Sequence, residues 1–219
     1  MKTAVVVGAG PGLGNHIAQE FGSHGYQIIL MARRKEKLDE YVEDLKAKGI
    51  TAFSQPVDAG DSHSIKKAFE ETRKQGFDID TLIYNAADLK QKPVDQLDGK
   101  EMLNHFRIDV AGAMDCVNEV LPEMKQKKQG TILFTGGLLG VFPNASYHYA
   151  CMSMDKAALR ALAQMLNQSL ENSGVYAGIV NVMGNVGSDT AMDPAKVAQA
   201  FWELAAYRNG FEKDYPAHD

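Results

Sequence analysis

Short apolar runs alternate with helical segments along this chain, and that alternation constrains the fold more than any other feature. The runs are TAVVV, QIILMA, TAFSQPV, DTLIYN, TILFT and AGIVNVM, and each precedes or follows an amphipathic segment. Runs of this length predict β-strands, and a helix between successive strands returns the chain so that the strands lie parallel. The pattern predicts an α/β protein with a doubly wound parallel sheet of six strands in a three-layer sandwich.

The helices are predicted from the spacing of their apolar residues. Apolar side chains recur at helical intervals over residues 38–45, and Gly49 is placed as a C-terminal stop. Longer apolar helices are predicted over residues 102–117 and 159–170. Asp193, with a proline after it, predicts the N-cap of the last helix.

Composition narrows the class of protein. The chain has 219 residues, 45% of them hydrophobic, and a net charge of −5, so we expect one globular domain over residues 1–219 without a nucleic-acid-binding stripe. No apolar run approaches the roughly 20 residues that span a bilayer, and the run that ends at Gly8 is too short for a signal sequence. Cys116 and Cys151 are expected as buried free thiols, which favours a cytoplasmic location. The six histidines lack metal-ligand spacing, so no metal is expected.

A glycine-rich loop, GAGPGLGNHIA, follows the first predicted strand. It lacks the third glycine of the pattern G-x-G-x-x-G, because Leu13 stands there. Glycines allow a tight turn close to a pyrophosphate, and the following helix offers free N–H groups and the positive end of its dipole. We therefore expect a dinucleotide here, the alternative being a turn without ligand. The loop residues expected to contact it are Gly8, Gly10, Pro11, Gly12, Leu13 and Gly14.

The spacing G-x-x-x-G-x-G resembles the signature of the short-chain dehydrogenase/reductase family, and the resemblance extends nearly end to end. It implies a Rossmann fold, a nicotinamide dinucleotide cofactor and hydride transfer. Where this fold usually holds an NAD ribose with an acidic residue, the chain has Ala32, followed by Arg33 and Arg34. Guanidinium groups suit phosphate oxygens, so the pair indicates NADP(H), with NAD(H) less favoured. Alternatively, both arginines only begin a charged helix surface.

Further positions resemble the family's cofactor contacts. Asp58 resembles the aspartate that approaches the adenine amino group, although it could instead cap the next helix. The segment YNAA at residues 84–87 resembles the family's N-N-A-G, and NVMGNVGSD resembles its P-G-x-x-x-T. The resemblance implies cofactor contacts at Asp58, Asn85, Ala86, Gly184, Val186 and Ser188.

The family's catalytic serine, tyrosine, lysine and asparagine are only partly retained. Alignment to the family places Gly137 at the serine, and Lys156 at the lysine with Met152 four residues before it in place of the tyrosine. Tyr149 stands seven residues before Lys156, about 10 Å along a helix axis instead of about 6 Å. Asp109 takes the asparagine position in FRIDVAG. Tyr149, Lys156 and Asp109 are the catalytic candidates, and the resemblance implies that Lys156 also binds the nicotinamide ribose.

These observations favour an NADP(H)-dependent oxidoreductase that acts on a small carbonyl or alcohol substrate with a rearranged proton transfer. The alternative is an NADP(H)-binding sensor or regulatory protein that has lost catalysis. The resemblance implies a homodimer or homotetramer formed through the family's fourth and fifth helices, here residues 102–117 and 159–170. The tail after Arg208 lacks the family's apolar closing strand, so a seventh strand is doubtful, and the connection before the last helix leaves a short or absent lid.

Overall fold

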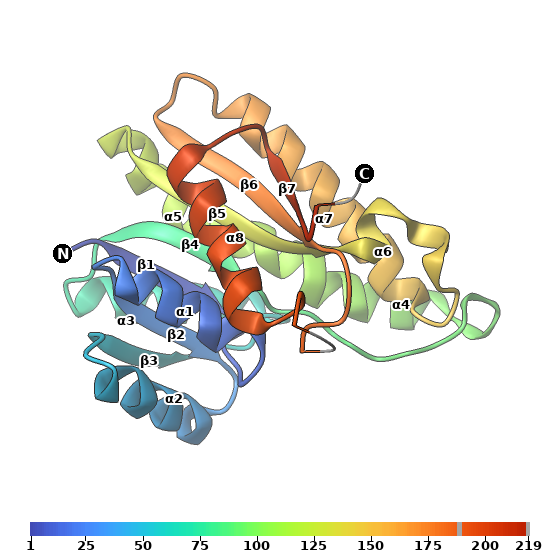
Figure 1. Ribbon diagram of the computed structural model, residues 1–219, viewed down its shortest axis with the longest axis horizontal. Coiled ribbons are helices and arrows are strands. Elements are labelled where there is room, and N and C mark those ends of the chain that lie inside the picture. Colours follow the sequence, from blue (N-terminus) through green and yellow to red (C-terminus); the bar gives the residue numbers. More distant parts are fainter. Residues whose placement is uncertain (188–189, 218–219) are drawn as a thin grey trace.

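The computed structural model describes residues 1–187 and 190–217 (Figure 1). Its strands are β1 (Thr3–Val7), β2 (Gln27–Ala32), β3 (Ala52–Pro56), β4 (Ile79–Tyr84), β5 (Gly130–Gly137), β6 (Val175–Val182) and β7 (Glu212–Tyr215). Its helices are α1 (Leu13–Ser23), α2 (Lys35–Ala47), α3 (Ser62–Lys74), η1 (Val94–Gln96), α4 (Gly99–Phe106), η2 (Arg107–Ala111), α5 (Gly112–Lys127), α6 (Leu138–Val141), η3 (Pro143–Ala145), α7 (Ala150–Ser169) and α8 (Pro194–Tyr207).

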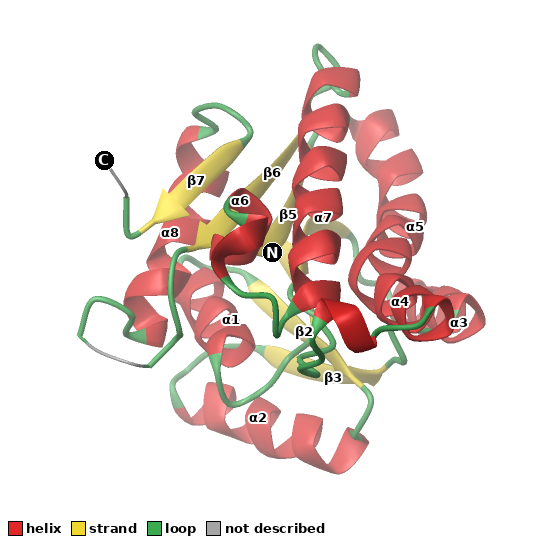
Figure 2. Cartoon of the chain, turned by 90° about the vertical axis from the view of Figure 1, so that its right-hand side faces the viewer, coloured by secondary structure: helices red, strands yellow, loops and turns green. Residues whose placement is uncertain are grey.

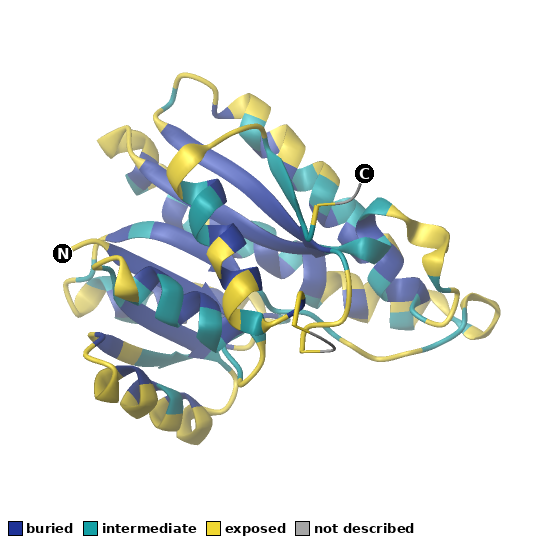
Figure 3. Ribbon diagram, viewed as in Figure 1, coloured by how far each residue is buried: buried dark blue, intermediate teal, exposed yellow. Residues whose placement is uncertain are grey.

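All described strands form one parallel sheet in the order β3-β2-β1-β4-β5-β6-β7, which confirms the predicted doubly wound α/β fold. Helices α1, α2 and α8 cover one face and α3, α5 and α7 the other (Figure 2). The central strands are buried on both faces, whereas the outer surfaces of the helices are exposed (Figure 3). This arrangement explains why the strand sequences are continuously apolar instead of alternating.

The doubt about a seventh strand was wrong, because β7 pairs in parallel with β6. Its sequence EKDY has no apolar pattern, and polar partners hold it instead. Both carboxylate oxygens of Glu212 accept hydrogen bonds from the Arg160 guanidinium on α7, at 2.6 and 2.7 Å. Asn181 of β6 donates to Asp214 at 2.7 Å. An edge strand with few apolar contacts can be charged, since one side of it faces solvent.

The Arg160→Ala variant is expected to lose about 1 kcal/mol of unfolding free energy, because its bidentate ion pair is part-exposed and screened by water. Urea unfolding measures the loss, and amide hydrogen exchange should show it concentrated in β7. Lys46→Ala, which removes a more exposed pair with Glu43, is the control and should change stability by less than about 0.5 kcal/mol. Equal effects of the two changes would show that Arg160 does not hold β7.

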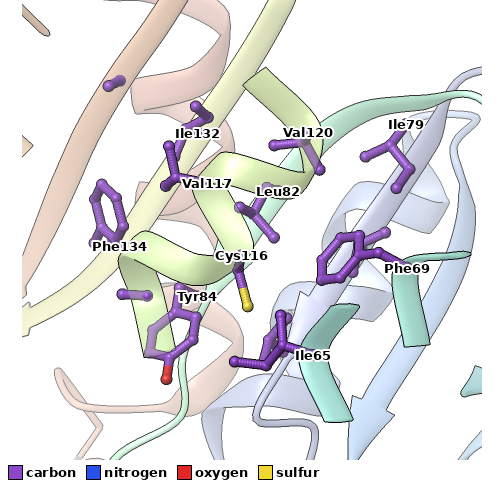
Figure 4. Close-up of a cluster of buried hydrophobic side chains, with 14 of the residues drawn as sticks. Ile65, Phe69, Ile79, Leu82, Tyr84, Cys116, Val117, Val120, Ile132 and Phe134 are labelled. Carbon is purple, nitrogen blue, oxygen red and sulfur yellow. The ribbon is translucent and has the colours of Figure 1, made fainter. Parts of the chain in front are cut away.

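The helix predicted over residues 102–117 is confirmed, and a π-helical segment, η2, lies within it between α4 and α5. Tyr84, at the end of β4, donates its hydroxyl to the carbonyl of Ile108 in η2. Figure 4 shows Tyr84 beside Cys116 of α5 in the core. Gly112 lets the chain approach closely, since a Cβ there would lie 2.1 Å from the Ala59 carbonyl oxygen. These contacts widen the helix at Asp109, and such segments often mark functional sites.

The structure agrees with the predicted N-cap of the last helix and with the predicted buried, free cysteines. The Asp193 carboxylate accepts a hydrogen bond from the Ala195 N–H at the start of α8, which confirms the predicted N-cap. Cys116 and Cys151 are both buried and unpaired. The described part of the connection 183–193 contains no helix or strand.

Candidate functional site

The glycine loop lies where the strand order reverses, between β1 and its neighbour β4. The chain continues from these two strands toward opposite ends of the sheet, which opens a crevice at their carboxyl ends. Asn85 closes the base of this crevice, because its N–H donates to the Val7 carbonyl at 2.8 Å and its Nδ2 donates to the Gly8 carbonyl at 2.9 Å. The two loops are thereby fixed to each other at the bottom of the crevice.

The loop glycines fall into two kinds. Gly8 has φ +89°, and a Cβ there would lie 2.4 Å from the Ala86 nitrogen. At Gly14 a Cβ would lie 2.6 Å from the Gly8 carbonyl oxygen. These two glycines allow the chain to pack against itself. Gly10 and Gly12 have nothing within 4 Å of a Cβ, so they border open space into which a ligand can come close to the backbone.

This crevice is a cavity of about 650 Å³, a size typical of cofactor sites. No side chain caps the N-terminus of α1, whose dipole and free N–H groups therefore face the cavity without a bonded carboxylate. On the other side, Arg33 and Arg34 line the wall after β2. The residues present fit a dinucleotide with an additional phosphate on its ribose.

Asp58 also lines this cavity, and it does not cap a helix. Its carboxylate accepts the N–H of Gly60 at 3.0 Å, whereas Asp61 caps α3 by accepting the N–H of His63. The interpretation of Asp58 as a helix cap is therefore wrong. Its position at the cavity wall is compatible with an adenine contact.

A chain of hydrogen bonds connects Lys156 to the glycine loop. The Lys156 ammonium, buried on α7, donates to the Thr135 carbonyl at 2.7 Å. The Thr135 hydroxyl donates to Asn85 Oδ1 at 2.9 Å, and Asn85 donates onward to Gly8. Lys156 is thus held at the carboxyl end of β5, next to the strand that carries Asn85.

A second polar group surrounds Lys156 on the side of η2. Asp109 is fully buried, and its Oδ1 accepts the N–H of Asp88 at 2.7 Å. Asp155, beside Lys156 on α7, is 3% exposed. Burial raises the pKa of the Asp109 carboxyl, and burial together with the charge of Asp109 raises the pKa of Asp155 to about 7. Burial lowers the pKa of the Lys156 ammonium, which Asp109 and Asp155 oppose.

Tyr149 lies apart from this group. It occupies the N-cap position of α7, and its hydroxyl accepts a hydrogen bond from Gln91 Nε2 at 2.6 Å. The structure therefore brings Lys156 and Asp109 together, and among the described contacts none joins Tyr149 to either of them. Tyr147 and His148 stack with ring centroids 4.0 Å apart, and both are exposed.

The two positions that differ most from the family are both accommodated by the backbone. Gly137 is extended, with φ −178°, and a Cβ there would have only Val182 O nearby, at 3.5 Å. Met152 is partly buried in the first turns of α7, one helical turn before Lys156. At Gly137 the structure therefore has space for a side chain.

Most of the predicted cofactor residues gather around the cavity, and several residues that the sequence did not suggest join the site. The predicted residues that line the cavity are Gly8, Gly10, Pro11, Gly12, Leu13, Gly14, Arg33, Arg34, Asp58, Asn85 and Ala86. Lys156, Gly184 and Val186 are not among its described lining residues, and Ser188 lies outside the residues described.

Asp88, His105 and Asp155 are the polar residues that sequence reasoning missed. The burial of Asp155 could have been predicted, because it lies four residues before Leu159 and hence on the buried face of the same helix. No local sequence pattern places Asp88 and His105 in the site, since their positions depend on how α4 and the loop after β4 pack together.

Comparison with known proteins gives consistent matches. The profile of the short chain dehydrogenase family matches residues 2–199. A 3-oxoacyl-[acyl-carrier-protein] reductase FabG from Staphylococcus epidermidis is 28% identical over 200 residues, 88% of this chain and 81% of that protein. A very-long-chain 3-oxoacyl-CoA reductase from Neurospora crassa is 32% identical over 182 residues, 81% of this chain and 54% of that protein. An alcohol dehydrogenase from Thermococcus sibiricus, complexed with 5-hydroxy-NADP, has the same fold, with a TM-score of 0.86, 21% identity and coverage of 98% of this chain and 95% of that one.

Among the described residues, no helix combines the length and apolar character that crossing a membrane requires.

Proposed function

Because the chain belongs to the short-chain dehydrogenase family of oxidoreductases, we propose that it transfers a hydride between NADP(H) and a small carbonyl or alcohol substrate. The observation that carries this proposal is the cavity, in which the open backbone at Gly10 and Gly12 faces Arg33 and Arg34. An uncapped helix N-terminus suits a pyrophosphate, and two guanidinium groups suit a 2′-phosphate. The 5-hydroxy-NADP named with the Thermococcus structure supports the same cofactor.

In this proposal, one set of residues binds the cofactor and another set transfers the proton. The glycine loop and the arginines would hold the phosphates, with Asp58, Asn85 and Ala86 lining the rest of the cavity. Bound NADPH would supply the hydride. Gly184, Val186 and Ser188 stay predicted contacts of the nicotinamide end, and Lys156 a predicted contact of its ribose. Tyr149, Lys156 and Asp109 stay the proposed catalytic groups.

The Arg33→Ala variant is expected to weaken NADPH binding about 10- to 100-fold and to leave NADH binding nearly unchanged. One charge-assisted hydrogen bond contributes about 1.5–3 kcal/mol, and only NADPH carries the 2′-phosphate. Fluorescence titration with both cofactors measures the ratio of the dissociation constants.

Lys35→Ala is the matched control for Arg33. Lys35 is a neighbouring cation, but it pairs with Asp39 and is not among the described lining residues of the cavity. Its removal should leave the affinity ratio as in the wild type. An unchanged ratio in Arg33→Ala would contradict the assignment of Arg33 to the 2′-phosphate.

The proposed activity is tested by adding a panel of carbonyl compounds to the protein with saturating NADPH and following NADPH absorbance. The panel includes aldehydes, ketones, quinones and a 3-oxoacyl thioester, since both named relatives are 3-oxoacyl reductases. Oxidation of NADPH that depends on one of these compounds supports the proposal. Failure to bind either cofactor would overturn it.

A second candidate function is that of an NADP(H)-binding sensor without turnover. The observation that favours it is the replacement of the family's serine and tyrosine by Gly137 and Met152. Tight NADPH binding without turnover on any compound of the panel would favour the sensor over the enzyme.

We also propose that the protein forms a homodimer or homotetramer through α4, α5 and α7. Met102, Leu103 and Phe106 expose apolar side chains on α4, and Met165 does so on α7. A monomeric mass in solution would contradict this. A cytoplasmic location stays a prediction, in keeping with the two unpaired thiols.

A further inference from the structure

The polar group beside Lys156 contains buried atoms without partners. Within the described residues, His105 Nδ1, Asp109 Oδ2, Ser153 Oγ and Asp155 Oδ2 are buried and form no hydrogen bond. Buried polar groups are nearly always paired, and an unpaired one is costly. Four such atoms in the polar group beside Lys156 call for an explanation other than the stability of the fold.

Asp155 lies where a replacement for the family's tyrosine would be useful. It is three residues after Met152, the tyrosine position, and residues at this spacing are neighbours on a helix, with about 5–6 Å between their Cβ atoms. It also directly precedes Lys156. Among the described contacts, no ion pair joins Lys156 to Asp155 or Asp109, although the charges of both raise the pKa of its ammonium. The two carboxyl groups thus influence the lysine without being paired to it.

We propose that Asp109 and Asp155 form a carboxyl pair that holds one proton and resupplies Lys156, replacing the family's tyrosine as the source of the proton in carbonyl reduction. This inference rests on the proposed function. The hydride forms the new C–H bond at the carbonyl carbon, and the C=O electron pair moves to oxygen. An N–H bond of Lys156 breaks as the O–H bond forms, and the neutral amine then takes the proton held by the pair.

The surroundings of the pair suit this role. The charged and titratable groups around it are Lys156 and Cys151 on α7, His105 on α4, Asp88 on the loop after β4 and Tyr84 on β4. Two carboxylates that are close and poorly solvated do not both ionise readily, which favours one retained proton near neutral pH. Asp88 is fixed next to Asp109 by its backbone N–H and also lines the cavity, so its carboxyl group, 3.7 Å from His105 Nε2, gives the pair a route by which a proton returns from solvent.

The direction of the pH dependence follows from the raised pKa of Asp155, about 7. Below that pH the carboxyl carries the proton and the pair can resupply Lys156. As the pH rises through the pKa the proton is lost, and the rate of carbonyl reduction should fall. The oxidation of an alcohol should change in the opposite direction, because the pair must then accept a proton.

The test compares the wild type with Asp155→Asn, Asp109→Asn and the control Asp95→Asn. Steady-state reduction rates with saturating NADPH are measured from pH 5 to 9, because Lys156 must be resupplied before each new turnover, and aspartate carboxyl shifts are followed by ¹³C NMR in protein labelled at aspartate. The wild type should show one carboxyl titrating near pH 7 and a rate that falls through the same pH. Asp155→Asn should lose both, with the rate below pH 7 reduced about 10²-fold or more.

Asp109→Asn restores the family's residue and removes the charge that helps keep Asp155 protonated. The fall of the reduction rate with rising pH should therefore occur at lower pH than in the wild type. Asp95→Asn changes an exposed carboxyl on η1 that lies outside the site, so it should keep both the rate and the pH profile of the wild type. Two results would overturn this inference but not the proposed function. One is wild-type turnover with no carboxyl that titrates above pH 5, and the other is an unchanged pH profile in Asp155→Asn. The same change of rate and pH profile in Asp95→Asn as in Asp155→Asn would do the same. Absence of wild-type turnover would overturn the proposed function, and this inference with it.

Discussion

The double variant Gly137→Ser, Met152→Tyr is expected to reduce carbonyl compounds about 10²- to 10⁴-fold faster than the wild type. It restores the family's serine hydroxyl and places a tyrosine four residues before Lys156. General acid catalysis by a positioned group commonly contributes a factor of this size. The backbone accommodates both changes, since a Cβ at Gly137 meets only Val182 O at 3.5 Å and Met152 is partly buried beside the lysine. Steady-state rates with saturating NADPH measure the gain.

The single variants and cofactor titration serve as controls for this gain. Each variant should bind NADPH as tightly as the wild type, because neither position is among the described lining residues of the cavity. The gain should therefore appear in kcat. A double variant that binds NADPH normally and turns over no faster would show that the substrate carbonyl does not lie next to these two positions.

The Gly8→Ala variant is expected to lose at least about 3 kcal/mol of unfolding free energy. Its φ of +89° is unfavourable for alanine, and the new Cβ would lie 2.4 Å from the Ala86 backbone nitrogen, which cannot move without separating β1 from β4. Denaturant unfolding followed by circular dichroism measures the loss.

Two other glycines separate the causes of that loss. Gly25 also has a positive φ but open space around a Cβ, so Gly25→Ala should lose only about 1–2 kcal/mol. Gly10 has open space and no positive φ, so Gly10→Ala should fold as the wild type does while binding NADPH at least about 10-fold more weakly. Unchanged binding in Gly10→Ala would contradict the placement of the pyrophosphate at this loop.

Much of the cofactor cavity could be predicted because its residues lie in short segments that follow strands. A glycine loop after β1, arginines after β2 and an asparagine after β4 meet at one edge whenever the strands are parallel and ordered as here. The β7 strand could not be predicted in this way. It has no apolar pattern, and its attachment depends on Arg160 and Asn181 from two other elements.

The π-helical segment η2 could not be predicted, for a similar reason. Its apolar spacing continues from Met102 to Val117 as in one helix. The π-helical segment arises from Tyr84 on β4, whose hydroxyl donates to the Ile108 carbonyl, and from the approach of Ala59 to Gly112. No local pattern contains these contacts, which join residues far apart in the chain.

The sequence by itself determined the layered fold and the cofactor loop, because helical and strand periodicity and glycine spacing act over a few residues. The resemblance to the family also predicted that Gly137 and Met152 stand in place of two catalytic groups. Only the tertiary structure decided which acids stand beside Lys156. Asp109 and Asp155 are 46 positions apart in the numbering and become neighbours when η2 packs against α7. Burial then changes their protonation, and burial is a property of the packed molecule that no local segment contains.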